Sequence, residues 1–243
     1  MRRVVVPWRE TPQTFSSEEW SHLLNSATRY GHAEVVKVLL KDKRVDPTAK
    51  GNHAIQEASA RGHAEVVELL LNDGRVDPTD SKNEAIIVAS IVGRTDVVKA
   101  LLKWQGKNDK RVDPSANDNY AIRAASRNDH AEIVEALLNW DGPEHLRVDP
   151  TADGDLPIRA ASEKGRAEVV ELLLKDGRAN PSADDNYAIR VASKKGRAEV
   201  VELLLNDGRA NPSARDNQAI KWATENGHAE VVELLLKDPR VKP

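Results

Sequence analysis

The amino-acid sequence predicts an all-α solenoid, an elongated single domain of stacked helix-turn-helix units, and three observations lead to this prediction. A unit of 31 residues, complete at residues 180–210, recurs along the chain. The Asp-Pro or Asn-Pro pair that opens each unit returns after 31, 36, 36, 31 and 31 residues. Each unit contains two stretches of helical periodicity around a turn. Self-similarity at a fixed period of about 20–50 residues is typical of repeat architectures, whose units pack on their neighbours in a row.

The N-terminal part precedes the regular units. Residues 1–14 match no repeat and contain two prolines, so we expect a tail or a short extended lead-in there. Residues 15–45 are expected to form an N-terminal capping repeat, because the stretch from Gly31 to Leu40 matches the second half of every later unit. The front half of this repeat is rewritten. Its Ser16 and Glu19 have the spacing of a capping box, which starts a helix.

The regular units are each expected to fold as a loop, a short first helix, a turn and a longer second helix. An Asn before the first helix is the expected N-cap, and a residue with positive φ is expected to end that helix. The predicted units are 46–76, 77–112, 113–148, 149–179, 180–210 and 211–241, within one array over 15–243. The predicted caps are Asn52, Asn83, Asn119, Asn186 and Asn217, and the predicted helix ends are Gly62, Gly93, Asp129, Gly165, Gly196 and Gly227.

The second helix carries the apolar face that each unit must bury. Its sequence, Ala-Glu-Val-Val-Glu-Leu-Leu-Leu, places Val66, Val67, Leu70 and Leu71 on one broad side in the unit 46–76. Burying one Val or Leu fully stabilises a fold by roughly 1.5–3 kcal/mol. Because no unit can cover this face alone, stacking of the units is expected to drive folding.

These motifs resemble those of ankyrin repeats. The stretch from Ala188 to Ser193, Ala-Ile-Arg-Val-Ala-Ser, stands where that family has Thr-Pro-Leu-His-Leu-Ala-Ala, and Leu156-Pro157 keeps the family's proline. Gly-His/Arg-Ala-Glu-Val-Val-Glu-Leu-Leu-Leu corresponds to the family's second-helix motif. The resemblance covers about residues 16–241 in seven units. The units are shorter than the family's usual length of about 33 residues, which implies trimmed hairpin tips.

The resemblance implies a non-catalytic scaffold that binds a protein or peptide through its concave face, formed by loop tips and first helices. The residues that vary among units on this face are the predicted contacts: Asp118, Tyr120, Arg123, Leu156, Arg159, Asp185, Tyr187, Arg190, Gln218 and Lys221. The two tyrosines are the expected anchors, because large rigid aromatic residues are enriched at binding hot spots. The arginines and Lys221 could form a basic ladder faced by acidic tips. Alternatively, each Arg replaces a histidine that is structural in the family.

Two further features have alternative interpretations. Trp104 and Trp140 lie at equivalent places in the two long units, where each indole could pin its longer loop or contact a partner. The first helix of the unit 77–112 is more apolar than its siblings, through Ile86, Ile87, Val88, Ile91 and Val92. It could touch the enlarged loop nearby or present an apolar patch that a partner covers.

Composition and motifs exclude several function classes. The 36 Lys and Arg against 39 Asp and Glu give a net charge of −3, which offers no general attraction to nucleic acid or membranes. No apolar run approaches the length of about 18 residues that spans a bilayer. Cysteine is absent, and we expect a cytoplasmic protein. No metal, phosphate-binding or catalytic motif is present, so we predict no cofactor and no enzyme activity. His32, His63, His130 and His228 occupy a position that is Arg in other units, which favours a structural bond between units over metal binding.

The C-terminal unit suggests an alternative function. The stretch from His228 to Leu236 is an internal-type helix without polar rewriting, so it is expected to expose Val and Leu. Such an uncapped end is expected to fray, to dimerise or to continue into residues beyond this sequence. The alternative function is therefore a structural module that associates weakly with itself. The absence of cysteine, with one Met and one Phe, also fits an engineered binding scaffold.

Overall fold

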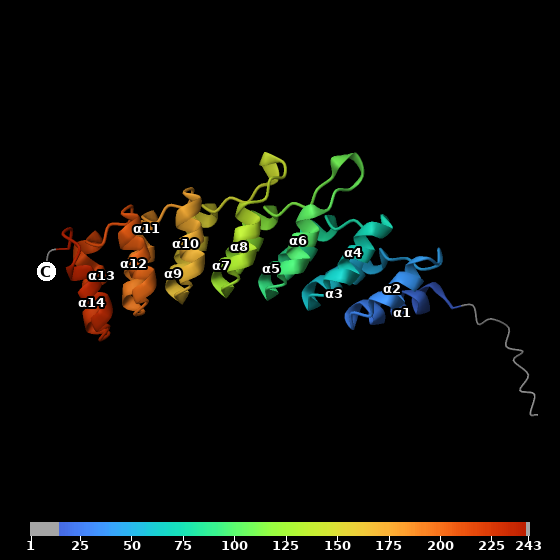
Figure 1. Ribbon diagram of the computed structural model, residues 1–243, viewed down its shortest axis with the longest axis horizontal. Helices are drawn as coiled ribbons and strands as arrows, with labels where there is room; N and C mark the ends of the chain where they lie inside the picture. The colour runs from blue at the N-terminus through green and yellow to red at the C-terminus, as the bar shows by residue number, and fades with distance from the viewer. Residues whose placement is uncertain (1–14, 242–243) are drawn as a thin grey trace, which may run out of the picture.

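The computed structural model describes residues 15–241, which form one row of paired helices in chain order (Figure 1). The helices of the described part are α1 (Ser17–Arg29), α2 (Ala33–Leu40), α3 (Ala49–Arg61), α4 (Ala64–Asp73), α5 (Asp80–Val92), α6 (Thr95–Lys103), α7 (Ala116–Asn128), α8 (Ala131–Leu138), α9 (Ala152–Lys164), α10 (Ala167–Asp176), α11 (Ala183–Lys194), α12 (Ala198–Asp207), α13 (Ala214–Glu225) and α14 (Ala229–Leu236). The predicted all-α solenoid is confirmed. The predicted N-terminal tail, 1–14, lies outside the described residues. Each of the seven predicted repeats contains one helix pair.

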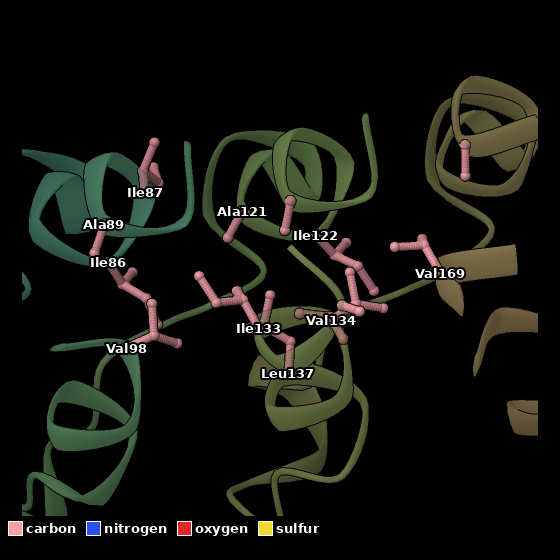
Figure 2. Packing of buried hydrophobic residues seen from close by; sticks show 14 of the residues in the cluster. Ile86, Ile87, Ala89, Val98, Ala121, Ile122, Ile133, Val134, Leu137 and Val169 are labelled. Carbon is pink, nitrogen blue, oxygen red and sulfur yellow. The ribbon is translucent and has the colours of Figure 1, made fainter. Parts of the chain in front are cut away.

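The core lies between neighbouring repeats. First helices pack on first helices, as α5 does on α3 and α7, and second helices pack on second helices, as α8 does on α6 and α10. Ile86, Ile122, Ile133 and Leu137 are fully buried in these layers (Figure 2). The predicted apolar side of the second helix is also buried in α4, whereas its glutamates are exposed. The buried residues therefore form one continuous core that runs along the row of described repeats.

The turns between the two helices of a repeat match the prediction. Gly62 and Gly93 have φ of 82° and 77°, and Asp129 takes the same left-handed conformation at 69°. Space restricts these positions as well, since a Cβ at Gly93 would lie 2.6 Å from Cε1 of His130 in the next repeat. Glycine therefore serves both the turn and the close approach of the neighbouring repeat.

The repeat tips differ from the prediction. In the repeat 113–148 the residues Asn117, Asp118 and Asn119 all have positive φ, of 53°, 55° and 60°, so the tip is a single left-handed turn. Asn119 does not cap its own helix. Its Oδ1 accepts a hydrogen bond from the backbone N–H of Asp149 in the next repeat, at 2.7 Å. Asn and Asp tolerate this conformation better than most residues, which explains their frequency at the tips.

The Asn N-cap prediction was wrong for the same reason in other repeats. Asn83 accepts from the backbone N–H of Asp113 at 2.8 Å, and Asn186 accepts from that of Asn211 at 2.7 Å. Asn52 makes no side-chain cap bond either, and its Nδ2 donates to Asp80 of the next repeat. A residue in the left-handed turn directs its side chain toward the next repeat, away from the N–H groups of its own helix. These side chains therefore join repeats.

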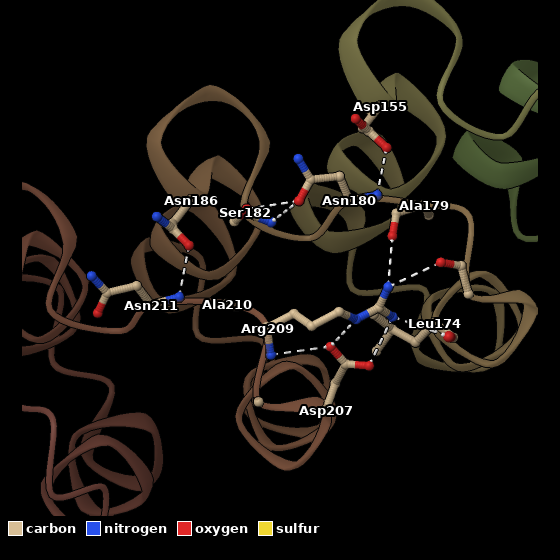
Figure 3. A network of polar contacts seen from close by, with 12 residues as sticks. Asp155, Leu174, Ala179, Asn180, Ser182, Asn186, Asp207, Arg209, Ala210 and Asn211 are labelled. Carbon is tan, nitrogen blue, oxygen red and sulfur yellow. Dashed lines mark hydrogen bonds and ion pairs between the residues drawn. The ribbon is translucent and has the colours of Figure 1, made fainter.

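An arginine near the end of each short repeat also joins neighbours, a role that the sequence analysis missed. Arg209 holds Asp207 in a two-pronged ion pair, with Nε–Oδ1 and Nη2–Oδ2 distances of 2.8 Å (Figure 3). The same guanidinium donates to the carbonyls of Leu174 and Ala179 in the preceding repeat, at 3.1 and 3.0 Å. Arg75, Arg178 and Arg240 make corresponding contacts. The recurring Asp-x-Arg spacing was the signal that could have revealed this bond.

In the two long repeats of the described chain the corresponding arginines, Arg111 and Arg147, bond within their own loops and not to the preceding repeat. Their loops, which contain the 3₁₀ turns η1 (Lys107–Asp109) and η2 (Glu144–Leu146), project from the same side of the row (Figure 1). Trp140 donates its indole N–H to the carbonyl of Leu102 at 2.9 Å. Leu102 occupies the position that Leu174 holds in its own repeat, so an indole takes over the bond that Arg209 makes in a short repeat.

Candidate partner-binding groove

A groove of about 530 Å³ lies along the first helices α7, α9 and α11, with one edge at the end of α5. Five of the predicted contact residues line it: Tyr120, Arg123, Leu156, Arg159 and Tyr187. We call this surface the first-helix groove. Tyr120, Leu156 and Tyr187 hold the same position in three successive repeats, so the stacking of first helices places them in one row.

The tyrosine rings are held by arginines. The guanidinium of Arg159 lies 4.9 Å from the centre of the Tyr187 ring, and that of Arg123 lies 5.6 Å from the Tyr120 ring. A cation over an aromatic face at this distance is attracted by the ring electrons. The Tyr120 side chain remains exposed at the rim. The groove therefore presents aromatic surface that is already oriented.

The arginines of the predicted ladder also hold the repeat tips. Arg123 donates to the carbonyl of Asp118 at 3.0 Å, and Arg159 donates to that of Gly154 at 3.1 Å. Gln56 makes the corresponding bond, to the carbonyl of Gly51 at 2.9 Å, in a repeat without the arginine. This recurrence supports the structural interpretation of the arginines, which brace the left-handed turn below them.

Arg190 is the most enclosed member of the ladder. It is 3% exposed, and it donates to the carbonyl of Asp185 at 2.8 Å and to Oε1 of Gln218 at 2.5 Å. Burial lowers the pKa of this guanidinium, and repulsion from Arg215 adds to the effect. Two tip carbonyls and the half-buried Gln218 therefore hold Arg190 below the surface of the groove.

The remaining predicted contacts lie outside the first-helix groove. Lys221 is exposed on α13, and it lies beyond the end of the groove that faces the C-terminal repeats. Asp118 and Asp185 are exposed at the tips. A hydrogen bond from Arg215, with Nη2–Oδ2 at 2.7 Å, lowers the pKa of Asp185.

The charge of the groove is mostly positive. Its lining contains Arg123, Arg127, Arg159 and Lys164 against one acidic residue, Glu163. Two acidic tips lie at the rim, where Asp184 contacts Arg159 at 2.9 Å and Asp153 approaches Arg123 at 3.8 Å. The alanines Ala124 and Ala160 line the groove with Leu156. The surface thus combines cations with small and aromatic apolar groups.

The apolar first helix of the repeat 77–112 contributes one edge. Ile86 and Ile87 are buried in the stack, whereas Ile91 lines the groove and Val92 is exposed. Val88 is half-buried, so the accessible part of the predicted apolar patch is mainly its C-terminal end.

The tryptophans of the long loops pack against their own chain. Trp140 is 9% exposed, and its ring lies so close to Gly142 that a Cβ there would be 2.1 Å from Cζ2. Trp104, which is half-buried, lies against Gly106 in the same manner. These contacts support loop pinning and leave little of Trp140 for a partner.

The histidines bond to the preceding repeat, as the sequence analysis expected. Nε2 of His63, His130 and His228 lies 3.0, 3.1 and 3.1 Å from the carbonyls of Arg29, Ile91 and Lys194. Within residues 15–241, no cluster of His, Cys, Asp and Glu side chains is arranged to hold a metal ion. No helix in the same range has the length and apolarity needed to cross a bilayer.

Comparison with known proteins relates this architecture to a family. The family model described as ankyrin repeats (3 copies) matches residues 23–113, 86–185 and 177–243. Similar solved structures include the human ASB11 ankyrin repeat domain, with a TM-score of 0.67 and 22% identity over 90% of this chain and 98% of that one. Another is the ankyrin repeat domain of Bcl-3, a unique member of the IkappaB protein family, with a TM-score of 0.64 and 22% identity over 88% and 97%. No curated protein sequence matches the chain.

Proposed function

Because this chain belongs to the ankyrin repeat family, whose domains generally mediate protein–protein interactions, we propose that it is a non-catalytic scaffold that binds a protein or peptide segment in the first-helix groove. The family is usually non-catalytic. The observation that carries the proposal is the row of Tyr120, Leu156 and Tyr187 around a groove of about 530 Å³. Such a row offers large contact surface from rigid side chains.

The groove is preformed. Arg123 and Arg159 connect the tyrosine rings to the carbonyls of the tips, so one network fixes both parts. A surface that is ordered before binding loses less conformational entropy on association. We therefore expect affinity to depend on the tyrosines as contacts and on the arginines as their supports.

The charge favours a segment that carries acidic side chains. Four cationic residues line the groove with Glu163, and the rim carboxylates Asp153 and Asp184 pair with two of them, so the net charge of this surface is still positive. An acidic segment is attracted by such a surface and binds faster at low salt. Apolar or aromatic side chains between the carboxylates would contact Leu156 and the tyrosine rings.

Selection of displayed random peptides with the purified protein tests the proposal. Peptides selected by the wild type are expected to be rich in acidic and aromatic residues, and Tyr187→Ala should weaken them about 30-fold, the usual effect of losing a hot-spot contact of about 2 kcal/mol. Tyr30→Ala is the matched control, because Tyr30 is exposed in the first repeat and lies outside the groove. Equal affinity of the wild type and Tyr187→Ala, with unchanged circular dichroism, would place the site elsewhere. In a separate binding assay, binding of nucleic acid by a protein that selects no peptide would contradict the proposed ligand class.

Self-association is a second candidate function, favoured by the last repeat. Leu236 is 51% exposed on α14, whereas the equivalent leucines of the other regular repeats are buried (Leu71 and Leu102) or half-buried (Leu138, Leu174 and Leu205). Light scattering against concentration tests this function, since a strictly monomeric protein would exclude it.

A further inference from the structure

We propose that copies of this chain stack head to tail, with the last repeat of one copy covering the first repeat of the next. This inference rests on self-association as the second proposed function, and it names the surface that the last repeat meets. We call the uncovered side of the first repeat, with Leu23, Val35 and Val38, the front face. The uncovered side of the last repeat, with Val232 and Leu236, is the rear face. The contact would continue the interface that already joins the repeats within the chain.

The front face is apolar although residues 15–45 were expected to cap the array, because the second helix α2 of this repeat keeps the valines of an internal junction. Val35 is 49% exposed, whereas the six equivalent residues, Val66, Val97, Ile133, Val169, Val200 and Val231, are between 0% and 1% exposed. Leu23 and Val38 are exposed beside it. The six equivalents follow a preceding repeat and Val35 does not. Among residues 15–241, the contact that buries these six equivalents therefore has no counterpart at the front face.

The rear face is also apolar and is not covered by a following repeat within the described residues. Val232 is half-buried, whereas Val170 and Val201 are fully buried at the equivalent position beneath the following repeat. Leu236 is exposed next to it. The two faces thus present the two halves of one apolar junction.

The polar groups of the junction are also divided between the ends. His63 and His228 contact the carbonyls of Arg29 and Lys194 in the repeat before them, at 3.0 and 3.1 Å. His32 holds the same position in the first repeat. The residue equivalent to Arg29 and Lys194 in the last repeat is Glu225, so in the proposed stack His32 would contact the carbonyl of Glu225 in another copy.

The space beside the turn glycine, which the histidine ring of the next repeat fills within the chain, is empty at the rear face of the described residues. A Cβ at Gly31 or Gly196 would lie 2.6 Å from the ring of His63 or His228, respectively. Gly227 is the equivalent residue of the last repeat, and nothing in the described chain lies within 4 Å of its Cβ position. The ring of His32 fits this vacancy by the same geometry.

The arginine of the first repeat is already arranged for the contact. Arg44 donates to Asp42 through Nε at 2.9 Å and Nη2 at 2.5 Å, the same two-pronged pair that Arg75 forms with Asp73. Arg75 also donates to the carbonyls of the first repeat, with Val45 at 2.7 Å. The acceptor that corresponds to Val45 for Arg44 is the carbonyl of Val241 in another copy. Hydrophobic, imidazole and guanidinium contacts therefore agree on one register.

This mode of contact predicts open-ended assembly. The front and rear faces are different surfaces, so each added copy leaves one of each free. Sedimentation velocity from about 1 µM to about 500 µM should show a mean size that grows past the dimer without a plateau.

Two variants test the register. Val35→Glu should block the front face and Leu236→Glu the rear face, so each protein alone should be monomeric. An equimolar mixture should form dimers and nothing larger, because the first variant keeps its rear face and the second keeps its front face. Val92→Glu is the matched control: Val92 is exposed on α5, away from both faces, and its replacement should leave assembly unchanged.

Three results would overturn the inference. Dimers of Val35→Glu alone would indicate contact between two rear faces, which contradicts head-to-tail stacking while leaving self-association in place. A monomeric wild type over the whole concentration range would exclude both, and peptide binding by the first-helix groove would be unaffected. A fall in melting temperature of monomeric Val35→Glu as large as that of a core substitution would show that the same chain covers the front face.

Discussion

Asp155 is predicted to destabilise the protein at neutral pH, and its replacement by Asn should raise stability. The side chain is 7% exposed and accepts a hydrogen bond from the backbone N–H of Asn180 at 2.6 Å. The other five regular repeats have Asn at this position, a neutral acceptor in the same left-handed turn. Burial raises the pKa of the Asp155 carboxyl, and the charge of Asp149 acts in the same direction.

The sign of the effect follows from the raised pKa. A group whose pKa is higher in the folded state stabilises the fold below its unfolded pKa, about 3.9 for Asp, and this contribution is lost as pH rises through the folded value. At pH 7 the carboxylate is charged and poorly solvated. Asp155→Asn keeps an acceptor for Asn180 without that charge, and we expect a gain of about 1 kcal/mol, the typical scale for one buried polar group. In a chain of this size the melting temperature should rise by about 2–4 °C.

Thermal and urea unfolding followed by circular dichroism from pH 7.5 to pH 4 measure the difference. The advantage of Asp155→Asn over the wild type should shrink as pH falls, because protonation removes the charge of Asp155. Asn186→Asp is the reciprocal control, since Asn186 makes the equivalent bond to Asn211. It should destabilise at pH 7, and less so in acid. A variant Asp155→Asn that is no more stable than the wild type at pH 7, or whose gain is independent of pH, would refute the reasoning.

Two other substitutions test the bonds between repeats. Arg209→Ala should lower the free energy of unfolding by about 1–3 kcal/mol, because it removes donors to three carbonyls of the preceding repeat as well as a partly screened ion pair. Arg111→Ala should cost less in the same urea titration, since Arg111 bonds to Gln105 of its own loop. Trp140→Phe keeps an aromatic ring over Gly142 but loses the donor to the carbonyl of Leu102, so unfolding should become easier by about 1 kcal/mol. Unchanged urea midpoints would show that these bonds add nothing to stacking.

The candidate site was predictable in part. Variation among repeats pointed to Tyr120, Leu156 and Tyr187, and their equivalent places in successive repeats predict that they share one face of the stack. The same variation did not distinguish Arg159, which lines the groove, from Arg190, which is buried. Each follows an isoleucine at the same place in its repeat, so the local sequence gives little to separate them. Their difference arises because Gln218 of the next repeat accepts from Arg190, whereas the exposed Asp184 pairs with Arg159.

The sequence by itself determined the architecture of this protein: the helix pairs, their stacking and the identity of the core. These properties depend on local periodicity and on a repeat that recurs every 31 or 36 residues, and both can be read from one chain. Tertiary structure alone decided the roles of the polar residues. Asn119 and Arg209 bond to groups 30 and 35 residues away, so their partners depend on how successive repeats face each other. The left-handed turn at each tip sets that direction, and the Asn and Asp residues that recur there are equally typical of an N-cap, so their pattern did not identify the turn.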